Sequence, residues 1–569
     1  MSLIKYNKFV LIVAAFLVFL PMTNSTIIIS IGVVAFIFTI AALGLNVVVG
    51  WTGLLDLGAS GFSALGSYIT AILLLNTDIP IVFIFIFSTL IGFFMGILLG
   101  IPTLKHKSDY FAILTLGFAE LVSLTIRNWT PITGGSYGLS NIPSISFFGH
   151  EFKSIPPTGY YYVSFFLLIL SFVILYYIRS SKVGKMFHLI KTNEDVAKVY
   201  GISPVSTKII AFGISASIIS LSGVLWASYY SSITWSQFDV LLSCIFLSLI
   251  IVGGSGNIKG VFIGGLLVTS SIEIIRLILV SNNLPQNFRF FVFAILLILF
   301  IRFKPKGLIP DKPIWIKKVP KILKNQITDN SYSKKNISPI SFSCSNISKS
   351  FDGIKAIDDV SLVIKNSETI GLLGPNGSGK TTLLNIINGL IKQDSGELRL
   401  NNKDISFIKP HRRAKLGIRR SFQHNFISED ISIIDNILLP SNKNICNFNL
   451  SENFQKLLSS NKIGEQLSFG EKKILDVVRL FSNAPNNSLL LIDEPTSGLD
   501  HAESIELVKF ITDSHKTIQC SIMVVSHDIK FLENMNLDRI LILNHGKVFA
   551  EGKLDKLKNE RNVQEIFWK

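Results

Sequence analysis

Ten apolar runs recur along the first 303 residues, and they constrain the fold more than any other feature of this chain. They occupy residues 9–20, 26–49, 60–75, 81–101, 110–126, 160–179, 208–230, 240–252, 261–280 and 288–303. Several approach the ~20 residues that an α-helix needs to cross a bilayer. Buried helices of a soluble protein are seldom so long and so numerous. The runs therefore predict a polytopic all-α membrane domain of about ten helices.

Basic residues lie between the runs in the pattern of a multi-pass membrane protein. Lysines occur between the fourth and fifth runs and after the tenth, and Ser180–Thr207 between the sixth and seventh is rich in them. If each run crosses once, these regions fall on one side, which the positive-inside rule makes cytoplasmic. No small-residue cleavage site follows the first run, so we expect an uncleaved segment with a cytoplasmic N-terminus. We interpret the net charge of +16 as that of cytoplasmic loops and a basic linker, and we expect membrane lipid and no nucleic acid as a partner.

Two of the apolar regions are rich in glycine, at Gly50–Gly66 and Gly253–Gly265. Two interpretations of these glycines stay open. Broken helices at membrane depth often line a translocation path, whereas small residues also allow helices to pack closely. Four ionisable residues within the apolar regions raise the same question of a pathway or a membrane face: Asp56, Glu120, Glu273 and Arg276.

The sequence GPNGSGKTT at 374–382 fits the pattern G-x-x-x-x-G-K-[ST] without a mismatch. Its glycines let backbone N–H groups turn toward phosphates, and the N-terminus of a following helix attracts the same anions. The apolar run Thr369–Leu373 predicts the preceding strand, and Thr381–Ile391 predicts the helix. Lys380 is then placed to reach the β- and γ-phosphates of a nucleotide, and the Thr381 hydroxyl to bind Mg²⁺. The predicted nucleotide-binding residues are Gly374, Pro375, Asn376, Gly377, Ser378, Gly379, Lys380, Thr381 and Thr382.

A second motif places two acids after an apolar run. Leu489–Leu491 leads through Ile492 to Asp493 and Glu494, which predicts a buried strand that ends in two carboxylates. This order suits an acid that serves Mg²⁺ followed by a base that acts on water.

Together these motifs resemble the ATPase subunit of ATP-binding-cassette (ABC) transporters. The further motifs LSFGE at 467–471, SGLD at 497–500 and VVSHD at 524–528 follow the order of that family. Gln423 in RRSFQHN matches the family's Gln loop, and Phe351 in SKSFDG matches the aromatic residue that stacks on adenine. The resemblance implies an α/β P-loop ABC ATPase domain that hydrolyses ATP with Mg²⁺.

The resemblance also implies roles for the matched residues. Glu494 acts on the attacking water, His527 contacts the γ-phosphate, and Gln423 assists catalysis. In the family, the signature sequence of one cassette contacts the nucleotide of another, and it commonly ends in Gln where this chain has Glu471. The implied Mg²⁺ residues are Thr381, Gln423 and Asp493, and the remaining implied nucleotide contacts are Phe351, Ser468, Phe469, Gly470, Glu471 and Asp500.

The apolar half resembles the permease subunits of branched-chain amino-acid (LIV-type) ABC importers. The matching stretches are Ala42–Gly58, Leu114–Leu124, Trp129–Pro143, Lys191–Ile202 and Ile251–Gly265. The resemblance implies uptake of branched-chain amino acids. An alternative substrate class is urea or short amides, because relatives with the same permease type are associated with them. Permease and ATPase are usually separate chains in this family, whereas here they are fused.

Within Ser180–Thr207, the sequence Glu194–Ala197 followed by Gly201 resembles the coupling motif of importers. In that family this short helix docks in a groove of the ATPase. The alternative is an ordinary basic loop held at the lipid surface.

The predicted organisation is a permease domain at 1–303, a basic cytoplasmic linker at 304–339 and an ABC ATP-binding domain at 340–569. The resemblance implies a multi-pass protein of the prokaryotic inner membrane with its ATPase in the cytoplasm. It also implies a second permease and a second ATPase, or a second copy of this chain, and an extracytoplasmic substrate-binding protein. Two rivals are an exporter half-transporter, which would have about six crossings and long cytoplasmic helices, and a membrane-tethered ATPase without transport.

Overall fold

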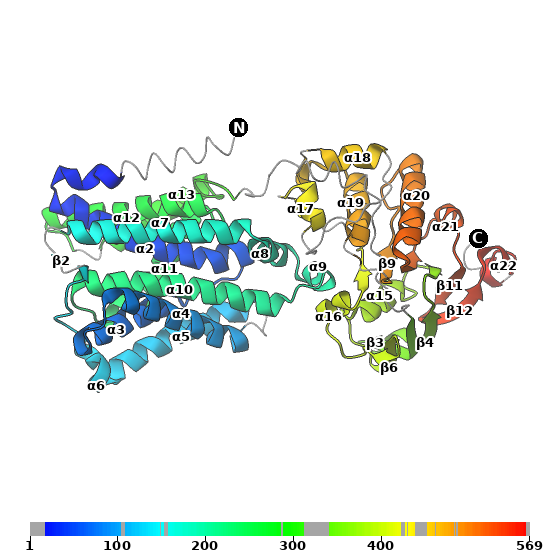
Figure 1. The fold of residues 1–569 in the computed structure, drawn as a ribbon, viewed down its shortest axis with the longest axis horizontal. Helices are drawn as coiled ribbons and strands as arrows, with labels where there is room; N and C mark the ends of the chain where they lie inside the picture. Colours follow the sequence, from blue (N-terminus) through cyan, green and yellow to red (C-terminus); the bar gives the residue numbers. More distant parts are fainter. Residues whose placement is uncertain are drawn as a thin grey trace. The chain divides into compact units, whose positions relative to one another are not determined.

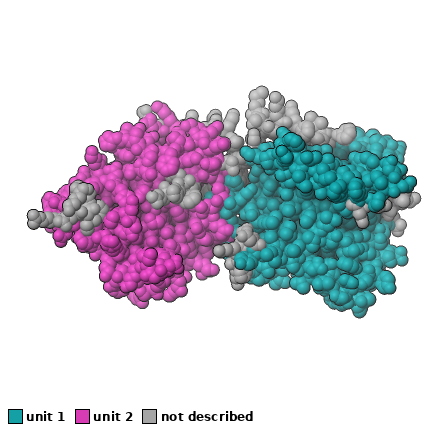
Figure 2. All heavy atoms as spheres, turned by 180° about the vertical axis from the view of Figure 1, so that it is seen from behind, with its two compact units in different colours: residues 1–191, 205–312 teal, residues 192–204, 313–569 magenta. Residues whose placement is uncertain are grey.

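The computed structural model describes residues 17–103, 108–147, 150–152, 157–285, 288–311, 341–422, 427–429, 431–438, 452–460, 462–482, 484, 487–560 and 562–564. The chain forms two compact units (Figure 2). Unit 1 comprises residues 1–191 and 205–312, and unit 2 comprises residues 192–204 and 313–569.

Unit 1 is helical, and its long helices lie side by side (Figure 1). Eight segments of its described part are long and apolar enough to cross a membrane. The first run falls mostly outside the described residues, and the other nine predicted runs each contain a helix. The principal helices are α2 (Thr26–Thr52), α3 (Ala59–Asn76), α4 (Ile81–Thr103), α5 (Ser108–Asn128), α7 (Thr158–Ser180), α8 (Lys182–Thr192), α10 (Pro204–Tyr230), α11 (Val240–Gly253), α12 (Ile258–Ser281) and α13 (Phe288–Phe303).

Short elements connect these helices. They are η1 (Leu20–Thr23), α6 (Thr130–Thr133), η2 (Gly135–Tyr137), β1 (Ser146–Phe147), β2 (His150–Glu151) and η3 (Trp235–Phe238). The last of them extends α11, which alone has 14 residues, to a 19-residue span at Trp235–Gly253. The short apolar run at 240–252 is therefore lengthened by a 3₁₀ turn.

The two glycine-rich regions meet in the interior of unit 1. The side-chain oxygen of Asn46 accepts a hydrogen bond of 2.9 Å from the Gly256 amide, and the Trp51 indole donates one of 3.1 Å to the Gly256 carbonyl. A Cβ added at Gly50 would lie 2.6 Å from the Gly256 nitrogen. Of the two interpretations, close packing is thus observed at this point, where α2 and α11 end and irregular backbone is satisfied by protein.

Unit 2 contains two sheets and their covering helices. The six-stranded sheet has the order β12-β11-β5-β10-β9-β8, with only β12 antiparallel, and the four-stranded antiparallel sheet has the order β4-β3-β6-β7. The strands are β3 (Phe342–Phe351), β4 (Ile354–Ile364), β5 (Thr369–Leu373), β6 (Ser395–Leu400), β7 (Lys403–Asp404), β8 (Ile418–Arg420), β9 (Leu489–Asp493), β10 (Ser521–Val525), β11 (Arg539–Asn544) and β12 (Lys547–Gly552).

The helices of unit 2 are α9 (Glu194–Val199), α15 (Lys380–Asn388), α16 (Pro410–Lys415), α17 (Ile433–Leu438), α18 (Glu452–Ser459), η4 (Gly464–Gln466), α19 (Phe469–Ser482), α20 (His501–Ile518), α21 (Ile529–Asn534) and α22 (Leu554–Leu557). Alternate residues of β9 and β10 enter two cores, one shared with α19 and α20 and one with α15 and the four-stranded sheet. The predicted strands at Thr369–Leu373 and Leu489–Asp493 are confirmed. Helix α15 ends before the predicted Ile391 because Gly389, at φ +85°, adopts the left-handed conformation that terminates helices.

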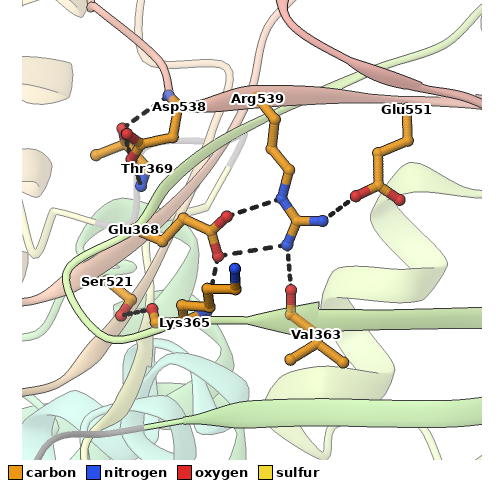
Figure 3. Close-up of polar contacts among 8 residues, drawn as sticks. All are labelled: Val363, Lys365, Glu368, Thr369, Ser521, Asp538, Arg539 and Glu551. Atoms are coloured by element: carbon orange, nitrogen blue, oxygen red, sulfur yellow. Dashed lines mark hydrogen bonds and ion pairs between the residues drawn. The ribbon is translucent and has the colours of Figure 1, made fainter.

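Arg539 connects the two sheets of unit 2 near the start of β5 (Figure 3). Arg539, the first residue of β11, donates a hydrogen bond of 2.8 Å to Glu368 and also contacts the Val363 carbonyl on β4 and the Glu551 carboxylate on β12. Charge-assisted hydrogen bonds of this kind fix geometry as well as adding energy. They hold the strand that leads to the GPNGSGKTT loop against its neighbours.

Candidate nucleotide site

The loop Gly374–Gly379 joins the buried strand β5 to helix α15, as the sequence predicts. Gly377 and Gly379 have φ values of +80° and +100°, which residues with a Cβ rarely adopt. A Cβ added at Gly379 would lie 2.4 Å from the Ala356 carbonyl oxygen. The loop therefore requires glycine, and its backbone is free to approach an anion at the N-terminus of α15.

Lys380 lies inside this loop. Its ammonium donates hydrogen bonds of 2.8 Å to the carbonyls of Gly374 and Pro375. Burial lowers the pKa of Lys380, while the nearby Glu494 and Asp493 act to raise it. The buried hydroxyl of Ser378 has no hydrogen-bond partner within the described part of the chain. The Lys380 ammonium and the Ser378 hydroxyl are thus placed at a glycine loop in a way that suits the phosphates of a nucleotide.

The carboxylate of Asp493 ends β9 and is buried with an arginine. Arg420, the last residue of β8, lies 2.8 Å from it, and both side chains are 2% exposed. The same guanidinium donates a 2.5 Å hydrogen bond to Asn385 of α15, and the Asp493 amide donates to the Ser421 hydroxyl at 3.0 Å. Nothing in the sequence pattern singles out Arg420, although it stands in the RRSFQHN stretch. Gln423 of that stretch lies outside the described residues.

Glu494 and His527 come together at the ends of adjacent parallel strands. The imidazole Nε2 lies 3.3 Å from the Glu494 carboxylate, and the Glu494 amide donates a 2.8 Å hydrogen bond to Val525 at the end of β10. Glu494 has φ +44°, a strained value for a residue with a side chain. The ends of β5, β10 and β9 thus gather the loop lysine, two carboxylates and one histidine at one edge of the sheet.

The LSFGE motif begins helix α19. The Ser468 hydroxyl accepts a 3.0 Å hydrogen bond from the Glu471 amide, and the Glu471 carboxylate accepts one of 2.8 Å from the Ser468 amide, which forms a capping box. Burial acts to raise the pKa of Glu471, but hydrogen bonds from Lys462 and Ser468 lower it overall. Glu471, which replaces the family's usual Gln, is therefore held as a carboxylate at a helix N-terminus.

The remaining predicted residues lie close to this motif or on β3. A Cβ added at Gly498 would lie 2.2 Å from the Phe469 ring, so the SGLD and LSFGE motifs pack together. Asp500 is the N-cap of α20 and forms a capping box with Glu503. Phe351 ends β3 with 42% of its surface exposed, and the Lys349 ammonium lies 5.4 Å from its ring centroid. An exposed aromatic ring is available for stacking.

The segment Thr192–Pro204 packs within unit 2 through a buried tyrosine. The Tyr200 hydroxyl accepts a 2.8 Å hydrogen bond from Arg479 Nε and donates one of 3.3 Å to Asp476. The Arg479 guanidinium also lies 4.4 Å from the Tyr200 ring centroid, and Arg479 and Asp476 form a buried ion pair. Burial raises the pKa of Tyr200, so its hydroxyl stays protonated. The family resemblance implies docking of this segment but does not indicate this tyrosine.

Two further hydrogen bonds extend this cluster toward the carboxylates. Asp476 accepts one of 3.3 Å from the Phe422 amide, next to the predicted Gln423. Lys473, one turn earlier on α19, donates to the carbonyls of Phe422 and Asp493 at 2.9 and 3.0 Å. Helix α19 therefore contacts both the segment at Tyr200 and the end of β9.

Two family models match this chain in order. The model of the permease component of branched-chain amino acid transport systems matches residues 27–300, and the model of ABC transporters matches residues 357–497.

Individual proteins match the two halves separately. The permease LivM of Salmonella typhimurium, from a high-affinity branched-chain amino acid transport system, is 30% identical over 54% of this chain and 76% of its own length. The ATP-binding protein LivG of the same system is 26% identical over 37% of this chain and 91% of its own length. The ATP-binding protein LptB of the lipopolysaccharide export system of Haemophilus influenzae is 30% identical over 39% of this chain and 94% of its own length.

The helical unit and the nucleotide-loop unit define a multi-pass ABC transporter in which a permease and an ATPase form one chain, and ATP hydrolysis is coupled to transport. Within that class, the chain belongs to the branched-chain amino acid transporter family and is homologous to both LivM and LivG.

Proposed function

We propose that this chain is the permease and ATPase of an importer that carries branched-chain amino acids across the cytoplasmic membrane of a prokaryote. The observation that supports this most is the family match over residues 27–300, which covers nearly the whole helical unit. The ATPase half alone does not indicate direction, because its relatives belong to both an amino-acid transport system and an export system. We therefore base import and substrate on the permease half.

The chemistry assigned to the ATPase rests on residues at one edge of the six-stranded sheet. Glu494 orients or deprotonates the attacking water, and His527, 3.3 Å from it, contacts the γ-phosphate. Lys380 and the loop amides bind the phosphates. Thr381, Asp493 and Gln423 would hold Mg²⁺, which would supply positive charge for the phosphoryl group when bound. Arg420 keeps the Asp493 carboxylate in a single orientation.

The remaining proposals concern assembly. Phe351 stacks on adenine, and Ser468–Glu471 with Asp500 complete the site of a second cassette. The transporter thus needs a second permease and a second ATPase, or a second copy of this chain, and an extracytoplasmic binding protein. Helix α9 is the coupling helix, and the functional domains are 1–303, the linker 304–339 and 340–569. The buried Tyr200 supports the coupling role, because an ordinary surface loop would not bury it.

Uptake by the reconstituted complex with its binding protein tests the proposal. Radiolabelled leucine is offered from the outside with ATP inside, and unlabelled valine, urea and acetamide compete. We expect valine to abolish leucine uptake and the two neutral amides to leave it unchanged. Uptake that ignores excess valine but falls with urea would replace the amino acid with an amide while retaining import, and ATP-driven efflux of leucine would refute import.

A further inference from the structure

A cavity of about 720 Å³ lies within unit 1, surrounded by the same end of five helices. The N-terminal parts of α2, α11 and α13 and the C-terminal parts of α10 and α12 line it. The cavity lies at the C-terminal end of α10 (Pro204–Tyr230), the end opposite Pro204. Its volume falls in the range of ~300–1,000 Å³ that is typical of small-molecule sites.

Four charged side chains, two acidic and two basic, line this cavity: Asp239, Glu273, Arg276 and Arg289. Asp239 already has a structural role, because its carboxylate caps α11 by accepting a 3.0 Å hydrogen bond from the Leu242 amide. The other three lie on α12 and α13. Glu273 and Arg276 lie within α12, one of the eight candidate membrane spans, where charged side chains are energetically costly and mark functional sites by default. One carboxylate (Glu273) and two guanidinium groups (Arg276 and Arg289) are therefore available to a ligand.

These three charges are only partly satisfied by one another. The Glu273 carboxylate lies 2.8 Å from Arg276 Nε, with side chains 16% and 42% exposed. That Nε is nevertheless not aligned for a hydrogen bond, and the buried Nε of Arg289 likewise has no acceptor among the described residues. An ion pair that leaves buried donors unused retains capacity for an anionic group.

The rest of the lining is aromatic and aliphatic. Trp226 stacks on Phe38 with ring centroids 5.4 Å apart and contacts Tyr230 at 5.0 Å. Leu242 and Ile245 of α11 line the same cavity. This surface suits an aliphatic side chain, since burial of its apolar area is favourable by about 25 cal/mol per Å².

We propose that this cavity binds a zwitterionic α-amino acid with an aliphatic side chain. Glu273 accepts the ammonium group, Arg276 and Arg289 bind the carboxylate, and the aromatic and aliphatic wall receives the side chain. The inference rests on the proposed import function and adds the place in the permease where the substrate is recognised. Urea and acetamide carry no net-charged group, so they would leave the acid and the arginines unused.

Equilibrium binding to the full chain tests the site without requiring any partner. The chain is placed in nanodiscs of phosphatidylcholine and phosphatidylglycerol, which supply no primary ammonium, and radiolabelled leucine binding is measured. The competitors are 4-methylpentanoate, which lacks the ammonium, and 3-methylbutylamine, which lacks the carboxylate. We expect each to compete at least about tenfold more weakly than leucine, the effect of one lost charge-assisted hydrogen bond. Equal competition by either compound would overturn the proposal without any substitution.

The variants Glu273→Gln and Arg276→Gln then assign the two groups. We expect Glu273→Gln to weaken leucine binding at least about tenfold and not to weaken 4-methylpentanoate, and Arg276→Gln to weaken leucine equally and not to weaken 3-methylbutylamine. Glu120→Gln on α5 and Arg302→Gln at the opposite end of α13 are matched controls, because neither residue lines the cavity. Thermal unfolding of each variant in the same nanodiscs, compared with the wild-type chain, shows that the variant is folded.

The uptake assay separates failure of this site from failure of the proposed function. If the wild-type complex imports leucine and both cavity variants do so with unchanged KM, the site is wrong and the function stands. If the wild-type complex imports urea and not leucine, both are wrong.

Discussion

Substitution of Tyr200 by phenylalanine tests whether the Tyr200 hydroxyl holds helix α9 on the ATPase unit. The change keeps the ring, and with it the cation–π contact to Arg479, but removes one hydrogen bond of 2.8 Å and one of 3.3 Å. Both partners are charged and buried. The perturbation therefore isolates the polar part of this contact.

The expected magnitude follows from the strength of hydrogen bonds to charged groups, ~1.5–3 kcal/mol each. Because the bond to Asp476 is long at 3.3 Å, we assign about 2–3 kcal/mol to the hydroxyl as a whole. Each 1.4 kcal/mol is a factor of ten, so the undocked population should rise about 30- to 150-fold.

Hydrogen–deuterium exchange of the intact chain reports this equilibrium. Helix α9 has only six residues, and a helix of that length is not stable in water by itself, so protection of its amides depends on docking. The amides of Ala197, Tyr200 and Ile202 are all hydrogen bonded within this segment. We expect their exchange rates in the Tyr200→Phe variant to rise by the factor given above, and the amount of substrate taken up per ATP hydrolysed by the assembled complex to fall.

The matched control lies on the same helix. Lys198 forms a 2.7 Å ion pair with Asp195 in which both side chains are partly exposed, and such pairs contribute below about 1 kcal/mol. Lys198→Gln should therefore change exchange by no more than about fivefold. If Tyr200→Phe exchanges no faster than this control, the hydroxyl does not hold the segment, and the reasoning from its hydrogen bonds is refuted.

Three further predictions concern catalysis, stability and topology. Glu494→Gln should retain ATP binding and lose turnover in the assembled complex, since the amide keeps the shape but not the base, and wild-type activity would refute the assignment. Arg420→Ala leaves a buried carboxylate at the end of β9 unpaired and should destabilise the ATPase unit by about 3–5 kcal/mol in thermal unfolding, whereas Arg399→Ala, which breaks an exposed pair, should change little; equal effects would contradict this. Cysteine probes should be labelled by an impermeant reagent from outside within Ser136–Ser146 but not at Asn193, and labelling of Asn193 would exclude the even-crossing topology.

The elements that the sequence predicts well are those that a local pattern specifies. Apolar length alone locates nine helices of the membrane half, because the bilayer sets a minimum span that few other structures need. The GPNGSGKTT loop is equally local, since Gly377 and Gly379 must adopt positive φ whatever surrounds them. Packing decides the rest. Gly389 ends α15 three residues before the last residue of its predicted range, and η3 extends a run that is too short by itself.

The residues that sequence reasoning missed act through contacts between distant segments. Arg420 is one of several basic residues before Gln423, and only the sheet order β9-β8 places it against Asp493. Tyr200 and Arg479 are separated by 279 residues, so no local spacing relates them. The sequence identifies Glu273 and Arg276 as charges in an apolar region. The relation of the third charge, Arg289, to them is visible only in the structure, where all three line the same cavity.

The position of Tyr200 in the chain gives its contact a mechanical consequence. Residues 192–204 belong to the ATPase unit, yet α8 precedes them and α10 follows them, and both of these helices belong to the membrane unit. Backbone continuity therefore transmits any displacement of the segment to the end of α8 and the start of α10. A free energy of 1.4 kcal/mol gives a tenfold ratio of docked to undocked segment. If the remaining contacts are neutral, a hydroxyl that contributes about 2–3 kcal/mol therefore keeps the segment docked more than 90% of the time. Loss of that hydroxyl should thus uncouple ATP hydrolysis from uptake before it alters either the nucleotide site or the membrane helices.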